Sequence, residues 1–128
     1  MNRVEKAVEL KNSGCCNCTQ AILIAYQDLI DLPKEKLEAL GSYFQFGMGN
    51  ATSTCGALLG AALVLGSVEG KGNKMLKAKE LNEEFKEKAG ALICKDLKGL
   101  ETGVCLCPCS KCVEIAATLI EERISGTK

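Results

Sequence analysis

Histidine and tryptophan are absent from the 128 residues of the chain, and only 4% of the residues are aromatic. Without histidine, one chain cannot build a Cys–His catalytic pair, a Cys₂His₂ zinc site or a haem attachment of the C-x-x-C-H type. The low aromatic content leaves few platforms on which nucleic-acid bases could stack. Any chemistry must therefore rely on sulfur, carboxylates and lysines.

An excess of charge of either sign is also missing, because 16 basic residues balance 16 acidic ones. A neutral chain gives no electrostatic reason to expect binding to nucleic acid or to an anionic membrane. The first residues are amphipathic, unlike the apolar core of a secretory signal, and the apolar run over residues 55–68 is short for a bilayer span. We therefore expect a cytoplasmic protein that binds neither nucleic acid nor membranes.

Cysteine, by contrast, is abundant, with nine residues in the chain. Structural disulfides are rare in the cytoplasm, so many cysteines there indicate metal binding, catalysis or redox sensing. An odd number also prevents complete pairing within one chain. The competing interpretation is that some cysteines serve only as small buried apolar residues. It applies best to Cys94, which lies within the apolar segment A-L-I-C.

Hydrophobic spacing and capping residues predict a single all-α domain of about six helices over residues 1–128. Asn2 with Glu5, and Asn17 with Gln20, have the spacing of capping boxes that open the first two helices. The second helix is expected to continue to about Ile30. Later helices are expected over residues 33–44, 55–68, 74–89, 91–97 and 108–125.

The stretch over residues 50–66 is predicted to form the central buried helix. Hydroxyl side chains at residues 52–54 can cap it, which would place Cys55 at the first or second helical position. Gly56 and Gly60 are four residues apart, a spacing typical of a surface where helices approach closely. The same small-residue face could serve self-association, so a homo-oligomer is one expectation.

Several cysteines fall at or near predicted helix starts, among them Cys18, Cys55, Cys109 and Cys112. The amino end of a helix carries about half an elementary positive charge, which favours thiolate over thiol. Cys109 and Cys112 form a C-x-x-C unit in which Lys111 adds positive charge. Thiolates of this kind attack disulfides and bind metals.

The segment C-G-A-L-L-G at residues 55–60 resembles the C-GCAxxG-C-C family of redox-active proteins. Cys18 in G-C-C-N-C-T-Q-A, Cys94 before K-D-L-K-G and Cys112 in K-C-V-E-I-A look like the other cysteines of that family. The resemblance implies a redox or metal role for these positions and for Cys55. The chain departs from the family name at Thr54, where the name has glycine. Five cysteines are additional to the pattern: Cys15, Cys16, Cys105, Cys107 and Cys109.

The first hypothesis is a redox protein that works by thiol–disulfide exchange or electron transfer with a partner redox protein. In this hypothesis the C-x-x-C unit would be the exchangeable dithiol. No nucleophile–base pair, paired carboxylates or phosphate-binding loop is evident in the sequence, which argues against a hydrolase. The candidate catalytic residues are Cys18, Cys55, Cys94, Cys109 and Cys112.

The second hypothesis is a protein that holds zinc or an iron–sulfur cluster through sulfur ligands alone. The run C-x-C-x-C-x-x-C has enough ligands, although its spacing differs from that of ferredoxins. The third hypothesis is a helical interaction module whose cysteines only pack. The candidate metal ligands are Cys105, Cys107, Cys109, Cys112, Cys55 and Cys18.

Overall fold

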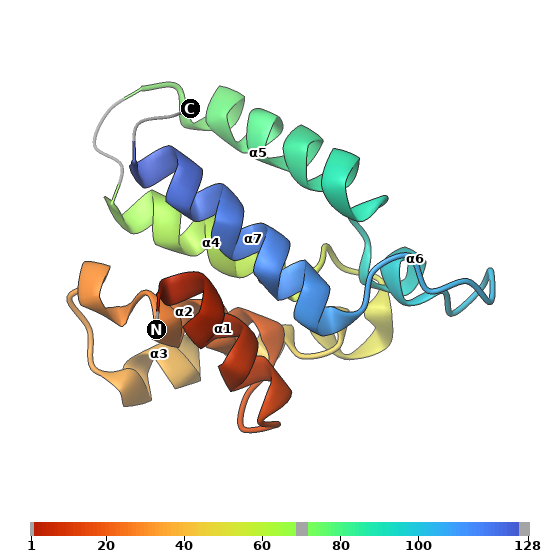
Figure 1. Ribbon diagram of the computed structural model, residues 1–128, viewed down its shortest axis with the longest axis horizontal. Coiled ribbons are helices and arrows are strands. Elements are labelled where there is room, and N and C mark those ends of the chain that lie inside the picture. Colours follow the sequence, from red (N-terminus) through yellow and green to blue (C-terminus); the bar gives the residue numbers. More distant parts are fainter. Residues whose placement is uncertain (1, 69–71, 126–128) are drawn as a thin grey trace.

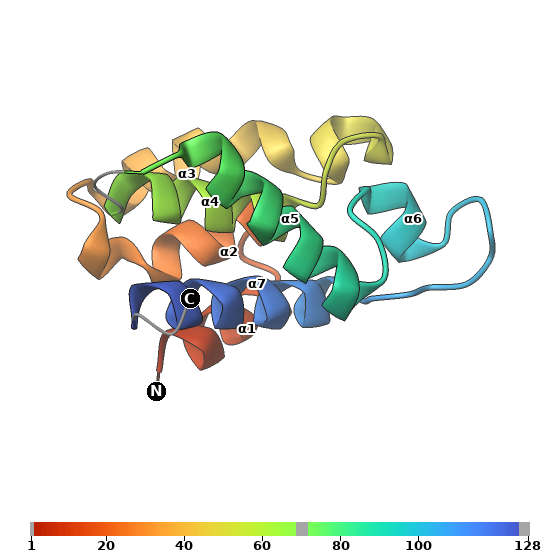
Figure 2. The same ribbon diagram turned by 90° about the horizontal axis from the view of Figure 1, so that it is seen from above.

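The computed structural model describes residues 2–68 and 72–125, and its regular structure over these residues is helical apart from one isolated β-bridge (Figures 1 and 2). Short 3₁₀ and π turns complete the pattern: η1 (Gln27–Leu29), η2 (Ser42–Phe44) and η3 (Gly47–Ala51). The all-α prediction is therefore confirmed. The α-helices are α1 (Arg3–Asn12), α2 (Cys18–Ala25), α3 (Lys34–Gly41), α4 (Gly56–Val68), α5 (Lys74–Ala89), α6 (Cys94–Lys98) and α7 (Cys109–Ile124).

Both predicted capping boxes are present and open α1 and α2. The side chain of Asn2 accepts from the backbone N–H of Glu5, and the side chain of Asn17 accepts from that of Gln20, each at 2.8 Å. The prediction that the second helix reaches Ile30 is wrong. That helix ends at Ala25 with Tyr26 as its C-cap, and the chain continues into the 3₁₀ turn η1.

Close packing of α4 against α2 explains the two glycines of the central segment. A Cβ atom added to Gly56 would lie 2.9 Å from the hydroxyl of Thr19, and one added to Gly60 would lie 2.9 Å from Cβ of Ile22. The Thr19 hydroxyl also donates to the carbonyl of Gly56 at 2.7 Å. The predicted close helix contact is thus confirmed. The surface proposed for self-association is covered by α2.

The other side of α4 faces outward, so the helix is buried on one side only. The helix packs mainly against α2 and α7, and Leu58 and Val64 are buried, whereas Leu63 is 45% exposed. Figure 1 shows α4 and α7 running side by side. Over the described residues, no helix has both the length and the apolarity that crossing a membrane requires.

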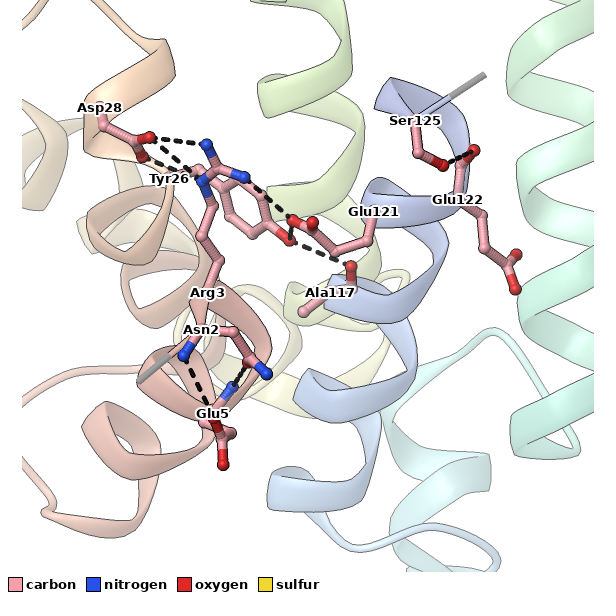
Figure 3. A network of polar contacts seen from close by, with 9 residues as sticks. All are labelled: Asn2, Arg3, Glu5, Tyr26, Asp28, Ala117, Glu121, Glu122 and Ser125. Atoms are coloured by element: carbon pink, nitrogen blue, oxygen red, sulfur yellow. Dashed lines mark hydrogen bonds and ion pairs between the residues drawn. The ribbon is translucent and has the colours of Figure 1, made fainter. Parts of the chain in front are cut away.

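A polar network at one end of the bundle joins α1, α7 and the turn after α2 (Figure 3). The hydroxyl of Tyr26 donates to Glu121 Oε2 at 2.6 Å, and its oxygen also lies 3.1 Å from the carbonyl oxygen of Ala117. Arg3 pairs with Asp28 at 2.7 Å and with Glu121 at 3.4 Å. Because the Tyr26 ring is fully buried, these bonds satisfy its hydroxyl and hold the three segments together.

Candidate functional site

A cavity of about 170 Å³ lies where four helices begin. The helices α2, α6 and α7 start at a cysteine, and α4 starts one residue after a cysteine. Figures 1 and 2 show α6 beyond the ends at which α4 and α7 begin. Six of the nine cysteines line this cavity: Cys18, Cys55, Cys94, Cys107, Cys109 and Cys112.

Cys55 lies directly before α4, one residue earlier than predicted, and its own sulfur accepts the helix amides. A hydrogen bond from Cys112 is the largest influence that lowers the pKa of Cys55, to about 7. The backbone N–H groups of Ala57 and Leu58 act in the same direction, while burial opposes them. The hydroxyl side chains of residues 52–54, which were predicted to cap this helix, do not cap it. A cysteine therefore takes the position of a helix cap and gains thiolate character from it.

A short antiparallel bridge between Thr54 and Ile93 fixes the two segments that carry Cys55 and Cys94. The N–H of Cys55 donates to the carbonyl of Leu92 at 2.8 Å, and the N–H of Cys94 donates to that of Ser53 at 3.0 Å. Burial raises the pKa of Cys94. The bridge therefore aligns two cysteines far apart in sequence, of which Cys94 keeps its proton.

Gly47 leaves the space that Cys94 occupies. A Cβ atom added to Gly47 would lie 2.7 Å from Cβ of Cys94, and the φ angle of Gly47 is +55°. Both the close approach and the left-handed conformation favour glycine. Phe46 and Met48, on either side, also have positive φ values, so this cavity wall is strained backbone.

The segment before α7 is held against α6 and carries one cysteine into the cavity. The N–H of Cys107 donates to the carbonyl of Leu97 at 3.1 Å. Cys107 is 3% exposed, whereas Cys105 is exposed and does not line the cavity. Cys112, one turn into α7, contacts the carbonyl of Cys107 through its sulfur at 3.6 Å. Of the sulfur-rich run, Cys105 alone is thus directed away from the site.

Cys109, the first residue of α7, lies beside a lysine. The ammonium nitrogen of Lys98 is 2.6 Å from Sγ of Cys109. A hydrogen bond from the Cys18 thiol is the largest influence that lowers the pKa of Cys109, to about 5, and Lys98 adds to it. The same hydrogen bond, together with burial, raises the pKa of Cys18. The structure therefore assigns a thiolate to Cys109 and a thiol to Cys18.

The prediction that Lys111 supplies positive charge to the site is wrong. Lys111 pairs with Glu114 at 2.6 Å and does not line the cavity. Lys98 and Lys11 line it instead. Lys111 is next to the C-x-x-C unit in sequence, but its position on α7 turns it toward solvent. Nothing in the local sequence marked Lys98, since its approach to Cys109 depends on how α6 packs.

The two cysteines of the C-x-x-C unit contact different helices. Cys109 contacts Cys18 at the start of α2, and Cys112 contacts Cys55 before α4. The site therefore contains two pairs. The outer pair is Cys18 with Cys109, and the inner pair is Cys55 with Cys112, whose residues are 6% and 2% exposed.

The remaining cysteines lie outside the cavity. Cys15 and Cys16 follow α1, and their sulfurs are 3.4 Å apart. All nine cysteines are free. Over the described residues, no group of three or more cysteine or carboxylate side chains has an arrangement ready to hold a metal ion.

A family model described as "Putative redox-active protein (C_GCAxxG_C_C)" matches residues 16–123. The chain belongs to the C-GCAxxG-C-C family. No curated protein and no solved structure matches it. The match supports a redox role in general. The four cysteines assigned to the C-GCAxxG-C-C pattern from the sequence all line the cavity: Cys18, Cys55, Cys94 and Cys112.

Proposed function

We propose that the cavity is a site of thiol–disulfide exchange, with Cys109 as the nucleophile and Cys18 as the resolving thiol. The observation that carries this proposal is the 2.6 Å contact between Lys98 and Cys109, with the Cys18 thiol hydrogen-bonded to the same sulfur. The thiolate is the form that attacks disulfides. A pKa of about 5 keeps Cys109 ionised at neutral pH.

The exchange balances within the cavity. The Cys109 thiolate attacks one sulfur of a substrate disulfide, so a mixed disulfide forms and the S–S bond of the substrate breaks. The first leaving thiolate takes the proton of Cys18. The Cys18 thiolate then attacks Sγ of Cys109, closes a Cys18–Cys109 disulfide and releases the second substrate thiolate, which takes a proton from water. Two electrons pass to the substrate, and the same steps run in reverse when the site oxidises a dithiol.

The inner pair extends this scheme. Cys55, with its pKa lowered to about 7, is the more acidic member, and Cys112 keeps its proton. Both residues line the same cavity as the outer pair. By the same exchange chemistry, the inner pair would reduce a Cys18–Cys109 disulfide. The inner pair would itself be oxidised to a Cys55–Cys112 disulfide.

The test is to treat the reduced protein with an excess of disulfide, to quench samples with acid at increasing times and to map the products by mass spectrometry. A Cys18–Cys109 disulfide is the expected first product. Cys18→Ser should halt the reaction at the mixed disulfide on Cys109, whereas Cys105→Ser, outside the cavity, should leave both rate and product unchanged. Formation of other disulfides before the outer pair closes would contradict the assignment.

A second candidate function is cysteine-ligated metal binding, favoured by the number of sulfurs that line one cavity. Zinc or an iron–sulfur cluster would draw on these ligands after loss of their protons. Cys105 would bind such a metal only if its loop moved. The predicted ligands that line the cavity are therefore the other five. Anaerobic purification followed by iron and zinc analysis and an absorption spectrum tests this candidate. A colourless protein without either metal would exclude it.

A further inference from the structure

The wall of the cavity that the six cysteines line carries positive charge. Lys11 enters it from the last turn of α1, and Lys98 enters it from the end of α6. Among the described residues that line the cavity, none is an aspartate or a glutamate. The other polar side chains there are the amides of Asn17 and Gln45. When Cys109 is a thiolate, it balances one of the two ammonium groups. Cys55, with a pKa of about 7, is only partly ionised at neutral pH, so the cavity keeps a net positive charge.

The reactive sulfurs lie within this cavity and do not project from the surface. Cys109 is half-buried, and the inner pair is almost completely buried. The cavity volume of about 170 Å³ is close to the ~150 Å³ that holds a molecule the size of benzene. A disulfide must enter the cavity to meet these sulfurs, which suits a small compound better than a bond on the surface of a folded protein.

We propose that the substrates of this site are small anionic disulfides, and the corresponding thiols in the reverse direction. An acid group on the substrate would pair with Lys11, while Lys98 pairs with the Cys109 thiolate. This inference rests on the proposed exchange function and adds the substrate class to it. The chemistry is the exchange described above, in which the acid group binds and does not react.

The test compares three symmetrical disulfides that differ in charge. They are bis(2-carboxyethyl) disulfide, bis(2-hydroxyethyl) disulfide and cystamine, which are negative, neutral and positive. The rate at which Cys109 attacks each disulfide is divided by the rate at which a free small thiol attacks the same disulfide. This division corrects for differences in the intrinsic reactivity of the three disulfides. The normalised rate should be highest for the carboxylate and lowest for the amine, with roughly a fivefold step between neighbours, and the steps should shrink at high salt.

Two lysine variants on α1 sharpen the comparison. Lys11→Gln should lower the ratio of the carboxylate rate to the amine rate by at least roughly fivefold. Lys6→Gln is the matched control, because Lys6 is exposed on the same helix and lines a different hollow with Arg3 and Asp28. It should leave the ratio unchanged.

The outcomes separate the two proposals. Equal normalised rates for all three disulfides, with exchange still occurring at Cys109, would overturn the anionic substrate class and leave the exchange function in place. A ratio unaffected by Lys11→Gln would overturn the role of Lys11. Failure of Cys109 to react with any of the three would overturn the exchange function itself.

Discussion

Replacing Lys98 with methionine should raise the pKa of Cys109 and slow its reaction at neutral pH. The two charges are 2.6 Å apart, so their attraction is about 1.6 kcal/mol in water and several times larger in a protein interior. Because both side chains are partly exposed, solvent screening favours the lower part of this range. One pKa unit corresponds to about 1.4 kcal/mol, so we expect a rise of roughly one to two units.

The assay is the rate of alkylation of Cys109 by iodoacetamide as a function of pH, with the modified residue identified by mass spectrometry. The midpoint of the wild-type profile should lie near the pKa of about 5, and that of Lys98→Met should lie clearly above it. Lys111→Met is the control, since Lys111 is closer in sequence but pairs with Glu114. Equal shifts in the two variants, or no shift in Lys98→Met, would refute the assignment of Lys98 as the partner of the thiolate.

Two further predictions concern stability and are read from urea unfolding under reducing conditions. Gly60→Ala should destabilise the protein by roughly 1–3 kcal/mol through the clash with Ile22, whereas Gly66→Ala, with no atom within 4 Å, should stabilise α4 by about 0.5–1 kcal/mol; equal effects would contradict the close contact. Stability should also rise from about pH 5 to ~8.5, because the unfolded chain binds a proton that native Cys109 has lost. Above that range it should fall, since native Cys18 keeps a proton that the unfolded chain loses; a flat profile in both ranges would contradict these pKa directions.

Local signals in the sequence predicted the helix boundaries where the chain's own neighbours determine them. The capping boxes at Asn2 and Asn17 involve residues three apart, and both formed as expected. The helix over residues 74–89 was predicted with its exact bounds, because Asn73 caps its start and Gly90 adopts the left-handed conformation that ends it. Such interactions need no knowledge of the rest of the fold.

The partners of the cysteines depend on packing between distant segments, so local reasoning could not predict them. The sequence favoured Cys109 with Cys112, three residues apart, as the dithiol. In the structure Cys109 contacts Cys18 instead. The two residues are far apart in sequence, and they meet because α2 and α7 both begin at the same cavity. The positions of the cysteines at helix starts could be predicted from the sequence, whereas their pairing depends on the packing of the helices.

The pairing of thiolates with positive groups also sets the direction in which the site would run. In a disulfide the sulfur carries no charge, so oxidation of Cys109 leaves Lys98 without its counterion. Oxidation of Cys55 likewise weakens the hydrogen bonds that its sulfur accepts at the start of α4. Both losses stabilise the reduced form relative to the oxidised one, and when the dithiol of such a pair is stabilised its disulfide is a strong oxidant. At equilibrium, the proposed exchange should therefore favour oxidation of substrate thiols by the Cys18–Cys109 disulfide.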